Sequence, residues 1–130
     1  MIIYEGFFVI DSLESTLSKD IEYKHITTEF KPTITHEHLY GKEANFMIVG
    51  YGNNQSNEGY LVKMTSCEDE ELQSLFEKIS IPHITLSVST NGKPVDTAKL
   101  TFKSTEKFII RCKFGGYIGK PIFENNLIHN

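Results

Sequence analysis

Alternating polar and apolar positions run along two segments of the chain that share the same three-residue core. Residues 22–31 and residues 81–90 each contain His-Ile-Thr. In an extended strand successive side chains point to opposite faces, so the histidine and the threonine share one face and the isoleucine lies on the other. Both segments are therefore predicted to be strands that bury an apolar face and present an imidazole beside a hydroxyl. These polar residues are His25 and Thr27 in the first segment and His83 and Thr85 in the second.

Two short helices are predicted between the strands. Asp11 is followed three residues later by Glu14, an arrangement typical of a capping box, and apolar residues at four-residue steps predict a helix over residues 11–21. Ser66 is a suitable N-cap for a second helix, in which apolar residues over 72–79 follow helical spacing. Each predicted helix comes before one of the two His-Ile-Thr segments, so the two motifs occupy equivalent places in the chain.

The predicted elements repeat in two halves of the chain, at about residues 2–64 and 59–114. Each half reads strand, capped helix, His-Ile-Thr strand, polar loop and strand. This order predicts an α+β fold over residues 1–130, a single domain of duplicated β-α-β-β halves that is bilobal and pseudo-twofold. Right-handed crossovers would place both helices on one side of the sheet and leave a central cleft on the other. The other strands are expected over residues 2–10, 45–51, 59–64, 99–102 and 107–114, and the loops over residues 33–42, 91–94 and 115–119.

The composition is that of an ordinary globular chain, and its charge narrows the classes of partner. The 130 residues are 39% hydrophobic and 23% charged, and the formal net charge is −4. This balance lacks the basic surface that follows a long nucleic-acid backbone, so long duplexes are not expected as partners. A small nucleotide or an RNA terminus fits the balance better.

The cysteines and the first residues bear on the compartment. Cys67 and Cys112 match no zinc spacing and are expected to be free thiols in a reducing compartment. Residues 1–10 are apolar, but they have no basic leader and Glu5 interrupts them, so no signal peptide is predicted. No apolar run approaches the roughly 20 residues of a membrane span. We therefore expect a cytoplasmic protein with no membrane partner.

Two imidazoles on either side of one phosphate suit acid–base cleavage of a phosphodiester. A neutral histidine takes a proton from water, and a protonated histidine gives one to the leaving oxygen. Threonine hydroxyls can donate hydrogen bonds to the non-bridging oxygens as negative charge develops there. Because the acid neutralises the leaving alkoxide, this chemistry requires no metal and no other cofactor.

The two motifs, their separation and the internal duplication resemble the 2H phosphoesterase superfamily, whose members carry two His-x-Thr/Ser motifs. The resemblance covers roughly residues 4–114. It implies that His25 and His83 are the catalytic pair, that Thr27 and Thr85 bind the phosphate, and that the fold is bilobal with a central cleft. Members act without metal on 2′,3′-cyclic phosphates at RNA ends, on small cyclic phosphates or on cyclic nucleotide signals, in some cases as viral weapons against bacterial immunity.

Other residues are weaker candidates. His36 and His38 could reach one metal ion from a loop, but no third ligand is evident, and exposed loop histidines are the simpler interpretation. Tyr4 could stack on a base at the mouth of the cleft, although a packed tyrosine is the commoner case. Lys42 and Lys99 could bring a cation to the phosphate, and solvated lysines are the alternative. Residues 115–119 lack the lysine and the following helix of a phosphate-binding loop.

Three functions therefore stand beside one another. The first is a metal-independent cyclic nucleotide phosphodiesterase with His25 and His83 as acid and base, in an order that the sequence leaves open. The second is a nucleotide- or RNA-end-binding module that keeps the cleft without turnover. The third is a structural duplication that binds no ligand.

Overall fold

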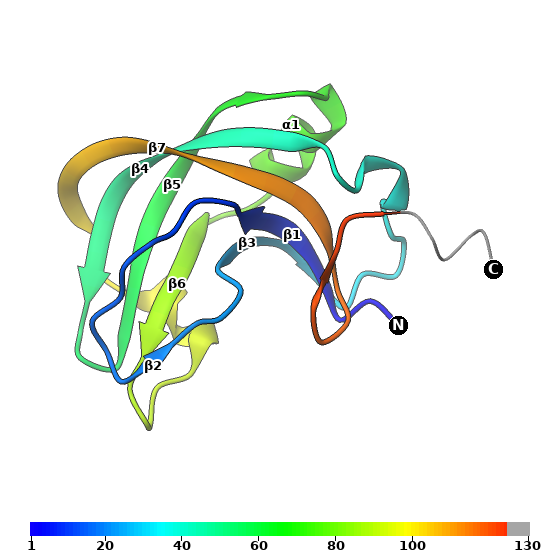
Figure 1. Cartoon of the computed structure of the whole chain (residues 1–130). Coiled ribbons are helices and arrows are strands. Elements are labelled where there is room, and N and C mark those ends of the chain that lie inside the picture. Colours follow the sequence, from blue (N-terminus) through cyan, green and yellow to red (C-terminus); the bar gives the residue numbers. More distant parts are fainter. Residues whose placement is uncertain (125–130) are drawn as a thin grey trace.

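Antiparallel strands make up nearly half of the described residues and join in one sheet (Figure 1). The computed structural model describes residues 1–124. The strands are β1 (Tyr4–Val9), β2 (Lys19–Asp20), β3 (His25–Phe30), β4 (Glu43–Asn53), β5 (Asn57–Cys67), β6 (His83–Val88), β7 (Lys103–Tyr117) and β8 (Pro121–Ile122). The other elements are the helix α1 (Glu70–Glu77) and two 3-10 helices, η1 (Glu37–Leu39) and η2 (Pro94–Lys99).

The sheet curves and brings strands from opposite ends of its order into contact. Its strands follow the order β2-β6-β5-β4-β7-β1-β3, with β8 paired to β7, and every pairing in the described residues is antiparallel. The strands β3 and β6 lie toward opposite ends of this order and share no ladder, yet they contact one another. Figure 1 shows these two strands close together on the inner side of the curve. Curvature of the sheet therefore brings the two His-Ile-Thr strands together.

Apolar residues of the central strands form the core. Phe7 on β1 is fully buried and packs edge-to-face against Phe46 on β4 and Phe114 on β7, with ring centroids 4.9 and 5.3 Å apart. Helix α1 adds Leu72, which is fully buried, and Phe76, whose ring centroid lies 5.3 Å from that of Phe46. Each such buried side chain stabilises the fold by about 1.5–3 kcal/mol. The isoleucines of both motifs are also fully buried, so each motif strand is held by its apolar face.

The predicted α+β fold of duplicated β-α-β-β halves is wrong, because the described residues form one antiparallel sheet with a single α-helix. The rule of right-handed crossovers concerns parallel strands and does not apply here. No helix forms over residues 11–21. Instead, Oδ2 of Asp11 accepts a hydrogen bond from the backbone N of Arg111 (2.7 Å), and the backbone N of Thr16 donates to Oε1 of Glu58 (2.8 Å). These contacts with the sheet replace the hydrogen bonds of a short helix, which is marginal on its own.

Most of the other predicted elements are confirmed in type and shifted at their ends. Helix α1 is capped by Asp69 in place of Ser66, since Oδ1 of Asp69 accepts a hydrogen bond from the backbone N of Glu71 (2.8 Å). The predicted strand over residues 99–102 is wrong, because η2 ends there and β7 begins at Lys103. Strand β7 also includes the first three residues of the predicted loop over 115–119. No helix in residues 1–124 is long and apolar enough to cross a membrane.

A repeat of strands is nevertheless present in the sheet. In the order β6-β5-β4-β7-β1-β3, strands at equal distances from the two ends correspond to one another. The corresponding pairs are β3 and β6, β1 and β5, and β4 and β7. Strand β1 contains Glu5-Gly6 and β5 contains Glu58-Gly59, and each pair lies at a bulge in the ladder to the adjacent motif strand. In both ladders the glycine lies opposite the motif threonine. The two halves are therefore related in the sheet, although only the second contains an α-helix.

The two Glu-Gly pairs have the same structural roles. A Cβ atom on Gly6 would lie 2.3 Å from the carbonyl oxygen of Ile26, and one on Gly59 would lie 2.4 Å from Cγ2 of Thr97, so neither site admits a side chain. The glutamates are 0% and 2% exposed, and each carboxylate accepts hydrogen bonds from a neighbouring loop. The sequence carries this signal, since both strands read Glu-Gly, an aromatic residue, an apolar residue and valine. Predictions based on the His-Ile-Thr repeat alone miss this second repeat.

Candidate active site

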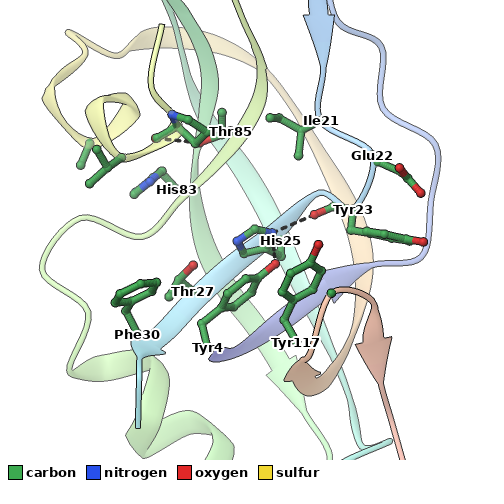
Figure 2. A pocket seen from close by; sticks show the side chains of 14 residues that line it. Tyr4, Ile21, Glu22, Tyr23, His25, Thr27, Phe30, His83, Thr85 and Tyr117 are labelled. Carbon is green, nitrogen blue, oxygen red and sulfur yellow. Dashed lines mark hydrogen bonds between the residues drawn. The ribbon is translucent and has the colours of Figure 1, made fainter. Parts of the chain in front are cut away.

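The two motif strands line one cavity of ≈ 720 Å³ (Figure 2). His25 and Thr27 are the first and third residues of β3, and His83 and Thr85 hold the same positions in β6. All four side chains line the cavity. A volume of this order accommodates a small organic ligand. The structure thus brings together the four residues that the sequence pattern singled out.

The two imidazoles are anchored in the same way. Nδ1 of His25 lies 2.8 Å from the carbonyl oxygen of Tyr23, and Nδ1 of His83 lies 2.8 Å from the carbonyl oxygen of Ile81. A carbonyl oxygen only accepts hydrogen bonds, so Nδ1 carries the proton in both rings. When neutral, each ring then has its lone pair on Nε2, for which the described residues supply no hydrogen-bond partner. Each Nε2 is therefore available to take a proton from a ligand or, once protonated, to give one.

Aromatic rings surround His25. The ring of Tyr4 stacks on the imidazole with centroids 4.4 Å apart and an angle of 25° between the planes, and Phe8 lies at 5.6 Å. The hydroxyl of Tyr4 is also 3.2 Å from Nδ1. Burial lowers the pKa of His25, the hydrogen bond to the Tyr23 carbonyl opposes this effect, and the positive charge of a protonated His83 lowers the pKa further. His25 is consequently neutral at neutral pH.

A polar network lies behind the second motif instead. Oγ1 of Thr85 donates a hydrogen bond to Oγ1 of Thr97 (2.8 Å) and lies 3.3 Å from the carbonyl oxygen of Pro94. Thr97 is fully buried and also accepts a hydrogen bond from Nδ2 of Asn57 (3.0 Å). The hydroxyl of Thr27, by contrast, has no hydrogen bond to the described residues. The two threonines therefore face the cavity with different supports.

The cavity wall is mostly apolar and aromatic, and no lysine or arginine of the described residues lines it. Nζ of Lys42 lies 3.3 Å from Oδ2 of Asp69, and Nζ of Lys99 lies 3.3 Å from Oδ1 of Asp96. Neither lysine lines the cavity, so the structure does not bring these two candidate cations to the motif residues. Positive charge for an anion in the cavity must therefore come from the imidazoles.

Three tyrosines line the cavity, and the sequence pattern singled out one of them. Tyr4 lies at the cavity as suggested, but its ring stacks on His25 and on Tyr117, whose centroid is 4.8 Å away. Tyr23 lies two residues before His25, so the alternation of an extended chain could have placed it on the same face. Tyr117 comes from the end of β7, and nothing in its local sequence indicates this position.

The loop histidines bind carboxylates rather than forming a metal site. Nδ1 of His36 lies 2.9 Å from Oε1 of the buried Glu5, and Nε2 of His38 lies 2.9 Å from Oε1 of Glu71. Within residues 1–124, no three histidine, cysteine, aspartate or glutamate side chains gather closely enough to hold a metal ion. The interpretation of His36 and His38 as a metal pair therefore finds no support in their contacts.

The sequence matches no protein-family model and no curated protein. The resemblance to the 2H phosphoesterases consequently depends on the two motifs themselves. The function must be argued from the cavity and from the residues that line it.

Proposed function

We propose that the protein is a phosphodiesterase that uses two histidines to open a cyclic phosphodiester of a small nucleotide or of an RNA end. The observation that carries this proposal is the equivalent anchoring of His25 and His83 at one cavity, each with Nδ1 held by the carbonyl two residues earlier at 2.8 Å. Fixed tautomers with Nε2 available are what general acid–base catalysis requires of an imidazole. This arrangement also supports the resemblance to the 2H phosphoesterase superfamily.

The two imidazoles divide the reaction between them. His25 is neutral because burial lowers its pKa, so its Nε2 takes a proton from the attacking water. The water oxygen forms a bond to phosphorus while the bond from phosphorus to one ring oxygen breaks. Protonated His83 gives its Nε2 proton to that oxygen, which leaves as a hydroxyl. The product is a phosphomonoester, and exchange with solvent returns the two histidines to their starting states.

The threonines stabilise the phosphate as its charge develops. Thr27 has a hydroxyl without a protein partner among the described residues, so it can donate directly to a non-bridging oxygen. Thr85 can do so when its hydroxyl turns from Thr97, which then donates to Oγ1 of Thr85 in return. Asn57 holds Thr97 in place for this exchange. No step in this scheme calls for a metal or another cofactor.

The cavity favours a small substrate with little charge. Its volume of ≈ 720 Å³ and the lack of lysine and arginine in the described lining favour one phosphate over a polyanion. The net charge of −4 argues in the same direction, so we expect no binding to long duplex nucleic acid. Both cysteines are free, which suits a reducing compartment, and we propose that the protein acts in the cytoplasm.

Turnover of a substrate panel tests the proposal. The panel contains 2′,3′-cyclic mononucleotides, RNA ends with a cyclic phosphate, and cyclic di- and trinucleotides, each assayed with a chelator. We expect turnover of at least one member, and loss by a factor of about 10² to 10⁴ in His25→Ala and in His83→Ala. His38→Ala is the control, because this exposed ring binds Glu71 away from the cavity and its loss should leave turnover unchanged.

Two other outcomes separate the alternatives. Binding of a panel member without turnover, in protein whose folding is verified by circular dichroism, would favour the nucleotide- or RNA-end-binding module. Silence in both assays would leave the structural duplication as the remaining interpretation. Turnover that survives loss of either histidine would contradict the two-histidine mechanism.

A further inference from the structure

The two sides of the cavity differ in chemistry. Figure 2 shows Glu22, Tyr23 and Tyr117 on one side of His25, while Phe30 lies on the other, beyond Thr27. Phe30 is 63% exposed, and the lining near η2 is likewise apolar. The side with Glu22 carries hydroxyls and a carboxylate. A ligand with its phosphate at the histidines therefore meets a hydrogen-bonding surface in one direction and an apolar surface in the other.

Glu22 is the only carboxylate that lines the cavity among the described residues. Its charge repels a phosphate, so the ligand group that it faces should carry no negative charge and should donate hydrogen bonds. The Glu22 carboxylate interacts with the hydroxyl of Tyr23 and is the main reason why the pKa of Tyr23 is raised. Both oxygens of a carboxylate accept hydrogen bonds, so this side chain offers acceptors to a ligand.

Aromatic surface adjoins this carboxylate. The ring centroids of Tyr23 and Tyr117 are 6.2 Å apart, and the ring of Tyr117 continues into a stack with Tyr4 at 4.8 Å. Tyr23 is 37% exposed, so part of its ring is open to a ligand. Tyrosine rings bind flat heterocycles by stacking without regard to their substituents. Because aromatic rings adjoin Glu22, the donor that this carboxylate faces is best supplied by a nucleobase.

We propose that Glu22, Tyr23 and Tyr117 form a subsite that binds the base of the substrate and selects guanine. The inference rests on the proposed function in that it takes the histidines to hold the phosphate of a nucleotide. Guanine presents two adjacent N–H donors, N1–H and the N2 amino group, which match the two oxygens of one carboxylate. Uracil has a single N–H between two carbonyls, which the carboxylate repels. Adenine and cytosine, with one amino group beside an acceptor nitrogen, fall between these two bases.

Binding of the four nucleoside 3′-monophosphates by the full chain tests the subsite without requiring turnover. Calorimetry is expected to show that 3′-GMP binds about 5- to 100-fold more tightly than 3′-UMP, the discrimination that a good two-point contact to a base provides. Glu22→Ala should bring this ratio to about one, and Glu22→Gln should lower it, because an amide replaces one acceptor oxygen by a donor. Glu29→Ala is the matched control, since Glu29 lies on β3, is exposed and does not line the cavity.

Turnover of the four 2′,3′-cyclic nucleotides, measured in parallel, separates the two proposals. If all four are turned over with equal kcat/KM, and Glu22→Ala leaves that pattern unchanged, base selection is wrong while the phosphodiesterase stands. A guanine preference that survives in Glu22→Ala would also overturn the assignment. If no mononucleotide binds and none of the cyclic nucleotides is turned over, the phosphodiesterase proposal fails for mononucleotides and the subsite fails with it.

Discussion

The two motif strands resemble one another in their histidines and threonines and differ in the residues packed around them. Both histidines donate Nδ1–H to the carbonyl two residues earlier, and both threonines lie opposite a glycine at a bulge. The first motif packs against the rings of Tyr4 and Phe8, and the second is backed by Thr97 and Asn57. The atoms that face a ligand are thus repeated while their surroundings have diverged. In the proposed reaction, this difference would allow two identical imidazoles to take opposite roles.

One position accounts for much of the divergence. Tyr4 directly precedes Glu5-Gly6, and Asn57 directly precedes Glu58-Gly59, so the two residues occupy equivalent places in β1 and β5. The tyrosine stacks on His25 and covers part of its ring. The asparagine instead donates hydrogen bonds to Thr97 and to the carbonyl oxygen of Lys93 (2.7 Å). The same backbone site therefore supplies an apolar surface in one half and a polar anchor in the other.

The proposed roles of His25 as base and His83 as acid can be separated by changing the leaving group of the substrate. His25→Gln and His83→Gln are each expected to lower turnover of a cyclic nucleotide by about 10² to 10⁴. On a nitrophenyl phosphodiester, whose leaving group departs without a proton, His83→Gln should recover most of its activity, because the acid is no longer needed. His25→Gln should stay impaired. Steady-state kinetics on both substrates measure the difference, and recovery by His25→Gln instead would reverse our assignment of acid and base.

Substitution of the bulge glycine by alanine should destabilise the protein to a similar extent in the two halves. Gly6→Ala and Gly59→Ala each place a Cβ within 2.4 Å of another atom, and we expect each to lower the free energy of unfolding by about 3 kcal/mol. Gly119→Ala is the control: its Cβ meets nothing within 4 Å, and only its positive φ of 101° opposes the change, at a cost of about 1 kcal/mol. Urea denaturation of the three variants compares them. Equal stability of all three would contradict the close approach at the bulges.

The polar network should matter to the second half alone. Thr97→Val leaves Nδ2 of Asn57 with one partner fewer and removes the contact of Thr85, so we expect a loss of about 1–2 kcal/mol in the free energy of unfolding. KM should rise several-fold, since Thr85 loses the residue that orients it. Thr101→Val, at an exposed position, serves as the control and should change neither quantity. A variant with lower stability and unaltered KM would show that the network supports the fold without orienting Thr85.

The burial of His25 should make stability depend on pH. The unfolded chain protonates this histidine near pH 6.5 and the folded protein does so at a lower pH, because burial lowers the pKa. Between these values the unfolded state binds more protons, so acidification through this window lowers the free energy of unfolding. Urea denaturation at pH 7.5 and pH 5.5 should show a smaller decrease in His25→Gln than in the wild type. An equal decrease in both would contradict a lowered pKa.

The local patterns of the chain were sufficient to predict the motif strands. Alternation placed Ile26 and Ile84 in the core and their neighbours on the opposite face, and the structure has both strands. The sequence also indicated α1, because its apolar spacing agrees with the contacts that Leu72 makes. The formation of these elements depends on residues close to one another in the sequence, so short sequence patterns predict them.

The first connection could not be predicted from local pattern. Residues 11–21 have helical spacing and a capping arrangement, yet their hydrogen bonds go to Arg111 and Glu58, which are far away in the sequence. The wall of the cavity has the same origin, since Tyr117 reaches it from the end of β7. The glycine bulges could have been found, because Glu-Gly occurs at the same place in β1 and β5. A comparison of the two halves along their whole length, beyond the three motif residues, would have shown it.

The lack of a ladder between β3 and β6 means that no direct bond sets the gap between the two imidazoles. The distance between the two imidazoles depends on the twist and bend of every strand pairing that lies between β3 and β6 in the sheet. The bulge beside Gly50 in the middle of the sheet contributes to this bend, because β4 shifts register there against both β5 and β7. A Cβ added there would press on Cβ of Leu61 and of Phe102 at 3.2 Å. The spacing of the two imidazoles is therefore expected to respond to substitutions that never touch the cavity.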